Sequence, residues 1–259
     1  FEQVASEAEI CKQIANCVIL LDDQVYASYK VKIIIVGTPA GIDEVLSRNS
    51  NIQTISSRLK EIPEVERMSP SEAQSLMKRG LEDQLNLRIL GRSQVFYDRM
   101  LSITDRIALE LQELGLRVAK EALKNKGTID QNVLHHAVQK WATNSIRSYC
   151  IMVLSRLNSR ETKASRRNQC IYAIGITEKE SFTYKDVEAK IRETFPTTTK
   201  GVSLNVSGEL SRLAKGDNPL LKRLPSDDAY RLASPKIRMA IRTILTIQDE
   251  KVHKVVLET

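Results

Sequence analysis

The sequence has no long apolar segment and few of the residues that build metal or disulfide sites. No apolar run reaches the roughly 18–20 residues that a membrane helix requires, and no secretory signal opens the chain. The four cysteines include no CxxC pair, and the three histidines lack metal-ligand spacing. We therefore expect no membrane partner, no metalloenzyme built on histidine, and buried free thiols in a reducing, cytoplasmic compartment.

The chain also lacks a P-loop, because the pattern G-x-x-x-x-G-K-[ST] occurs nowhere in it. The backbone amides of that loop cradle the phosphates of a bound nucleotide. A nucleotide site in this protein would therefore need a segment that these 259 residues do not contain. If the protein belongs to a nucleotide-binding class, we expect the chain to omit segments of a longer protein.

The composition is that of a globular protein, with 42% hydrophobic and 27% charged residues, and the length suits two or three domains. The net charge is +7, and it is concentrated late in the chain. Residues 163–238 contain 15 Lys and Arg and 9 Asp and Glu, so 15 − 9 = +6 falls there. A basic excess in one domain favours a polyanionic partner, usually nucleic acid.

Two apolar runs near the start predict an α/β parallel-sheet core fragment over residues 1–68. Residues 18–21 are continuously apolar, residues 31–36 are apolar except for Lys32, and both segments are rich in β-branched side chains. Such runs are typical of strands buried on both faces of a parallel sheet. We expect the two strands to be adjacent and parallel.

Residues 69–158 predict an all-α domain. Ser69, Pro70 and Glu72 have the pattern that opens a helix. Further along, one apolar stripe at helical spacing comprises Ile107, Leu111, Leu114 and Val118. Thr128 or Asp130 can cap a further helix, which would bury Leu134, Ala137, Val138 and Trp141.

Residues 159–259 predict a winged-helix (α+β) domain with a C-terminal extension. We expect helices over residues 169–176, 184–194 and 205–215, with Thr183 capping the second. Two short strands, residues 220–224 and 230–233, would follow around a Pro-Ser-Asp-Asp turn. Three helices followed by a hairpin form the winged-helix variant of the helix-turn-helix.

Several polar residues follow the predicted strands where ATPases place catalytic groups. Asp22 and Asp23 end the first strand, as the Mg²⁺ ligand and the water-polarising acid of a Walker B site do. Thr38 follows the second strand, and Arg58 lies where a cation could reach a neighbouring subunit's nucleotide. The alternative for the two aspartates is an ordinary acidic turn, and for Arg58 a surface arginine at a helix end.

The order of these features resembles AAA+ and STAND P-loop ATPases, including initiator-like and TniB-like members. The resemblance covers nearly the whole chain, from the acidic strand through the Gly-Thr-Pro strand, the Ser-Arg pair and a helical lid to the winged helix. It implies ATP and Mg²⁺ as cofactors, with Asp22 on the metal, Thr38 as sensor 1, Arg58 as arginine finger and Arg106 as sensor 2. One departure besides the missing P-loop is that residues 24–30 are too few for a parallel crossover, so either the middle strands connect differently or the chain omits segments of a longer protein, as we expect.

The resemblance implies an ATP-dependent switch that couples nucleotide state and self-assembly to DNA or to an effector protein. Seven residues are candidates for DNA contact, four on the third helix and three on the hairpin: Ser207, Ser211, Arg212, Lys215, Lys222, Arg223 and Arg231. Two alternatives stay open. One is a non-catalytic DNA-binding regulator with a degenerate ATPase core, and the other is a protein-interaction module without DNA affinity.

Overall fold

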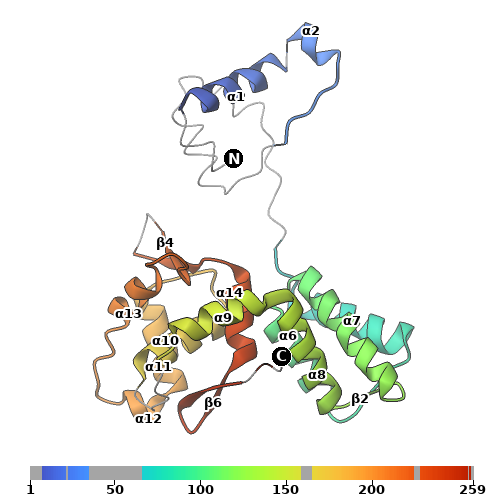
Figure 1. Ribbon diagram of the computed structural model, residues 1–259, viewed down its shortest axis with the longest axis vertical. Coiled ribbons are helices and arrows are strands. Elements are labelled where there is room, and N and C mark those ends of the chain that lie inside the picture. The colour runs from blue at the N-terminus through green and yellow to red at the C-terminus, as the bar shows by residue number, and fades with distance from the viewer. Residues whose placement is uncertain are drawn as a thin grey trace. The chain divides into compact units, whose positions relative to one another are not determined.

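The computed structural model of this chain describes residues 8–21, 23–34, 66–158, 165–224, 228–255 and 257. The chain divides into two compact units, Phe1–Val65 and Glu66–Thr259, and each is described here by itself (Figure 1). The described residues are mostly helical, with small two- and three-stranded sheets, one of them parallel. None of their helices is both long enough and apolar enough to cross a bilayer.

The predicted strand at residues 18–21 is wrong, because these residues continue a helix. Helix α1 spans Ala8–Leu20, and the short helix α2 spans Gln24–Ala27. Ala15 and Val18 are buried whereas Cys17 and Leu20 are exposed, which is helical rather than strand periodicity. A short apolar run is compatible with either element, and here the longer helical pattern from Ile10 onward decides.

The described part of the second predicted strand is also not a strand. Residues 31–34 form no regular element, and the side chains of Val31, Ile33 and Ile34 are exposed. The expectation that they are buried on both faces of a parallel sheet is therefore wrong for these four residues. The rest of that segment, residues 35–36, lies outside the described part.

The second unit begins with the helices that the sequence predicted for residues 69–158. The elements are α5 Pro70–Lys78, η1 Arg79–Gln84, β1 Arg88–Ile89, α6 Ser93–Ile103, α7 Ala108–Lys124, β2 Thr128–Ile129, α8 Gln131–Trp141, η2 Ala142–Ile146 and α9 Arg147–Arg156, with η1 and η2 being π-helical turns. Ser69 and Glu72 form a capping box at α5, and Asp130 caps α8, as expected. The segment is not all-α, because β1 and β2 pair in parallel; strands of two residues leave no sequence pattern.

The remaining elements follow the predicted order of three helices and a hairpin. They are α10 Arg166–Ile176, β3 Ser181–Phe182, α11 Tyr184–Thr194, α12 Pro196–Thr199, α13 Val206–Leu213, β4 Leu221–Arg223, β5 Tyr230–Leu232, α14 Pro235–Ile244, β6 Leu245–Gln248 and β7 Lys251–Lys254. Thr183 and Asp186 form the expected cap of α11, as a capping box. The strands β3, β5 and β4 form one antiparallel sheet in that order, and β6 and β7 form a hairpin.

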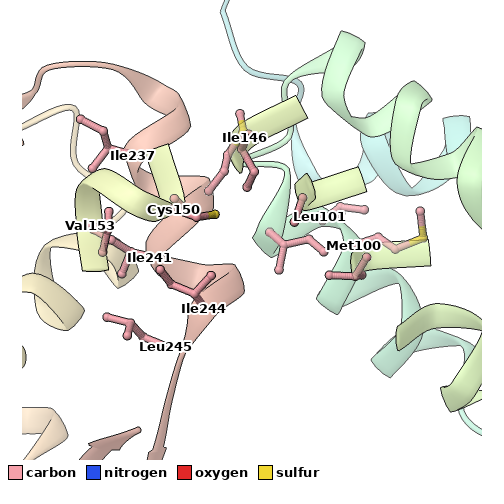
Figure 2. Close-up of a cluster of buried hydrophobic side chains, with 14 of the residues drawn as sticks. Met100, Leu101, Ile146, Cys150, Val153, Ile237, Ile241, Ile244 and Leu245 are labelled. Carbon is pink, nitrogen blue, oxygen red and sulfur yellow. The ribbon is translucent and has the colours of Figure 1, made fainter. Parts of the chain in front are cut away.

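Helix α14 joins the earlier and later elements of this unit. It packs against α6 and α9 and also against α10 (Figure 1). Its side chains Ile237, Ile241 and Ile244 are buried in a cluster with Cys150 of α9 and Met100 of α6 (Figure 2). Because this core is continuous, the helices of residues 66–158 form a support for the smaller elements that follow.

The thiols follow the expectation only in part. Cys150 and Cys170 are buried and free, and burial raises the pKa of each thiol to about 12. Cys17 is also free, but it is exposed on α1, contrary to the expectation of a buried thiol.

A group of charged side chains surrounds the buried Asp105 and includes two arginines of α14. The Asp105 carboxylate accepts hydrogen bonds from Arg67 at 2.8 Å, Arg238 at 2.7 Å and Arg242 at 3.1 Å. Arg242 also donates to the carbonyl of Gly175 and to Glu178. The cluster therefore ties the start of the unit, the segment after α6, the segment after α10 and helix α14 to one another.

Candidate nucleic-acid interface

Helix α13 and the β4–β5 hairpin are held together by short backbone connections. The N–H of Leu220 donates to the carbonyl of Leu213 at 2.9 Å, which brings the start of β4 back to the end of α13. Val206, Leu210 and Leu213 bury the inner face of α13, as the sequence predicted. The other face of this helix is consequently directed away from the core (Figure 1).

The seven predicted contact residues lie on these two elements and at the surface. Ser207, Arg212 and Lys215 are exposed, and Ser211 is half-buried. On the hairpin Lys222, Arg223 and Arg231 are exposed. The structure therefore leaves the outer face of α13 open, whereas packing of that face against the preceding helices would have closed it to any large partner.

The three-stranded sheet presents two cations side by side. Lys222 of β4 is directly opposite Arg231 of β5, and Ser181 of β3 is opposite Arg231 on its other side. All three side chains are exposed, while Leu221, Tyr230 and Leu232 turn inward. Like charges opposite each other in a sheet repel, and a bound anion would relieve that repulsion.

The other two arginines of this surface form ion pairs with carboxylates. Arg212 pairs with Glu209 at 2.8 Å, and Glu209 also receives Nε of Arg167 at 3.1 Å. Arg223 pairs with Asp228, whose hydrogen bond raises the pKa of the arginine. Among the described residues, Lys215, Lys222 and Arg231 have no ion pair, so they are the cations most available to an anionic ligand.

The outer face of α13 carries small side chains as well as charges. Ser207, Gly208 and Ser211 lie along it, and Asn205 precedes the helix in a left-handed conformation with φ of 48°. A Cβ on Gly208 would come within 2.9 Å of the Asn205 side-chain oxygen, so glycine lets the Asn205 side chain fold over the first turn. A helix with small exposed side chains can approach a partner closely through its backbone.

Some residues of this surface were not identifiable from the sequence. Ser181 belongs to it because β3 pairs with β5, but a two-residue strand has no sequence pattern. Glu209 restrains two arginines, and its spacing of three residues from Arg212 was the only local signal. Arg167 lies 42 residues before Glu209, so only the fold brings it there.

The predicted ATPase residues are not brought into one site by the described structure. Asp22, Thr38 and Arg58 lie outside the described residues. Asp23 does not end a strand: it caps α2, and its Oδ1 accepts from the N–H of Val25 at 3.0 Å. Arg106 donates to the carbonyl of Met68 and to Glu178, so its guanidinium belongs to the Asp105 cluster.

Within the described ranges, no group of three or more His, Cys, Asp or Glu is arranged to hold a metal ion. The predicted Mg²⁺ ligand, Asp22, is not among these residues. No family model matches the sequence, and no curated protein or solved structure is significantly similar to it.

Proposed function

We propose that residues 165–255 form a winged-helix module that binds duplex nucleic acid through α13 and the β4–β5 hairpin. The order of helices and strands, and the sheet order β3-β5-β4, support this class of domain. The observation that carries the proposal is that all seven candidate contact residues are at least partly exposed, on two elements joined by the Leu220–Leu213 hydrogen bond.

The dimensions and charges of this surface suit a duplex. Helix α13 has eight residues, so it is about 12 Å long, comparable to the width of the major groove of B-DNA. With α13 in that groove, Lys222 and Arg231 would contact phosphates on one side of it. Arg212 and the two serines are then the residues that can reach base edges.

The ATP-dependent switch remains a proposal for the intact protein. It rests on the sequence resemblance alone, since residues 18–20 are helical and residues 31–34 form no strand. ATP and Mg²⁺ would be bound by an AAA+/STAND core, and oligomers would form through Arg58. In that setting the winged-helix module would couple the nucleotide state of the core to binding of DNA or of an effector protein. The alternative is a regulator in which this module acts without catalysis.

The binding proposal is tested by titrating the protein into a labelled duplex at several salt concentrations. Three to five phosphate contacts predict a log–log slope of affinity against salt of about −3 to −5. The double change Lys222→Gln and Arg231→Gln should weaken binding to all sequences alike and reduce the slope by about 2. The matched control is Lys78→Gln with Arg88→Gln, which removes the same charge from exposed positions elsewhere.

Arg212→Ala should instead change sequence preference if its guanidinium contacts a base edge. Absence of salt-dependent binding, or equal effects of the two double changes, would contradict the nucleic-acid proposal. In that case the interaction-module alternative explains the exposed face of α13.

A further inference from the structure

Helix α7 has a row of exposed leucines on the face opposite its buried one. Leu111, Leu114 and Val118 are fully buried, whereas Leu109, Leu116 and Leu123 are 62%, 52% and 66% exposed. These three recur every seven residues, or about two helical turns, and so form one stripe. Exposed leucines aligned on one face of a helix are a candidate interaction site, unlike leucines scattered singly over a surface.

Charged residues border the stripe on one side. Glu113 and Lys120 are exposed and also seven residues apart, so they lie along the same edge of the leucine row. Glu113 accepts a hydrogen bond from the hydroxyl of Ser145 at 2.7 Å, which helps to fix its position. An exposed helix face with leucine at one heptad position and a flanking charge of each sign has part of the pattern by which helices pair.

We propose that this face pairs with the same face of a second copy of the chain, with the two α7 helices antiparallel. In an antiparallel pair centred on Leu116, Leu109 of one copy lies against Leu123 of the other. The same arrangement places Glu113 close to Lys120 of the other copy, and Lys120 close to Glu113. The surface is thus complementary to itself in both shape and charge, as a two-fold interface must be.

A parallel pair satisfies the leucines but not the charges. It sets each residue beside its own copy, which separates Glu113 from the other copy's Lys120 by about 10 Å along the axis. The antiparallel arrangement is therefore the one that the charge pattern favours. It requires neither nucleotide nor Arg58.

Sedimentation equilibrium of the full chain without nucleotide tests the pairing. The wild type should show a monomer–dimer equilibrium, and Leu116→Glu should weaken dimerisation by at least about tenfold because it places two carboxylates at the centre of the interface. Leu90→Glu is the matched control, since Leu90 is 50% exposed and lies outside α7. It should leave the dimer unchanged, as should Arg58→Ala.

Charge exchange and crosslinking test the orientation. Glu113→Lys and Lys120→Glu should each weaken the dimer, and the double change should restore it. With Cys11 and Cys17 replaced by serine, Leu116→Cys should form a disulfide-linked dimer. Leu109→Cys should crosslink with Leu123→Cys in a mixture of the two variants, but not with itself.

Several results would overturn the proposal. One is a wild type that stays monomeric at all concentrations, and another is a dimer that Leu116→Glu does not affect. Self-crosslinking of Leu109→Cys would exclude the antiparallel orientation. If Leu116→Glu leaves a monomer unchanged in mass but speeds proteolysis within residues 1–65, the chain's own N-terminal unit covers the leucines and no second copy does.

Discussion

Oδ2 of Asp105 accepts a hydrogen bond from Nη1 of Arg238 at 2.7 Å, although 133 residues separate them in the sequence. Both side chains are almost completely buried, and Arg242 reaches the other carboxylate oxygen from the next turn of α14. Asp105 is therefore the buried carboxylate that both arginines share, whereas their other anionic partners, Glu178 for Arg242 and Glu180 for Arg238, are exposed.

Replacing Asp105 with Asn should destabilise the protein by about 3–5 kcal/mol, because it removes the buried charge that pairs with both buried guanidinium groups. Asn also tolerates the left-handed backbone at this position, where φ is 51°, so the change isolates the lost charge. Urea unfolding measures the effect. Glu180→Gln, at an exposed residue of the same cluster, is the control and should cost less than about 1 kcal/mol. A loss below that value for Asp105→Asn would contradict the role of this carboxylate.

Two glycines should respond to alanine in opposite directions. A Cβ on Gly175 would lie 2.8 Å from Cβ of Ile241, because α10 and α14 approach closely there. Gly175→Ala should therefore cost about 1–3 kcal/mol through overpacking. A Cβ on Gly80 meets nothing within 4 Å, so Gly80→Ala should be neutral or stabilise by up to about 1 kcal/mol.

Thermal or urea unfolding of both glycine variants gives the comparison. Combining Gly175→Ala with Ile241→Ala should cost less than the sum of the single changes, because the second change removes Cγ2 of Ile241, the atom nearest to the added Cβ. Strict additivity would show that the clash with Ile241 is not the cause.

The cap of α11 predicts a pH dependence of stability. Hydrogen bonds from Lys179 and from Thr183 lower the pKa of Asp186 from 3.8 to about 2. A carboxyl whose pKa is lower in the folded state adds stability above its unfolded pKa and loses it as pH falls through the folded value. The stability difference between the wild type and Asp186→Asn should therefore be full above pH 3.8, decrease as the pH falls further, and vanish only below about pH 2.

Unfolding by urea at a series of pH values checks this dependence. Lys179→Met should bring the pKa of Asp186 closer to its ordinary value, so that stability changes over a narrower range of pH. A difference that stays constant between neutral pH and pH 2 would show that the carboxylate charge does not contribute.

The ATPase resemblance gives a prediction for the intact protein. Asp23→Asn should nearly abolish ATP turnover while nucleotide binding stays measurable, and Asp22→Ala should weaken Mg²⁺-dependent binding as well. Asn caps helices as well as Asp does, so Asp23→Asn should keep the cap of α2 and report on the charge alone. Steady-state phosphate release measures turnover, and unchanged release in Asp23→Asn would leave this residue a purely structural role.

Helix ends and amphipathic faces were predictable because their signals lie within a few residues. The Ser69–Glu72 and Thr183–Asp186 capping boxes define helix starts in the sequence itself. The buried row of α7 follows from helical spacing, and so do the inward residues of α13. The exposed leucines of α7 also recur at helical intervals, and the sequence alone does not tell which of the two apolar faces is buried in the core.

The wrong strand prediction for residues 18–21 shows the limit of predicting secondary structure from a short stretch of sequence. Their apolar, β-branched run suits a strand, yet the burial of Ala15 and Val18 follows the period of a helix. Arg106 shows a second limit. The partners of its guanidinium are Met68 and Glu178, which are 38 and 72 residues away, so no local pattern identifies them.

The sequence by itself thus determined the capped starts of α5, α8 and α11, the buried faces of α7 and α13, and the basic residues of α13 and the hairpin, because each depends on residues close together in the chain. Only the tertiary structure decided that Asp105 compensates Arg238 and Arg242, that Lys222 lies opposite Arg231, and that Leu116 is left exposed. Those relationships arise when α14 packs against α6 and α10 and when distant strands pair. Long-range packing sets which charges meet and which apolar face stays open, and no local spacing encodes it.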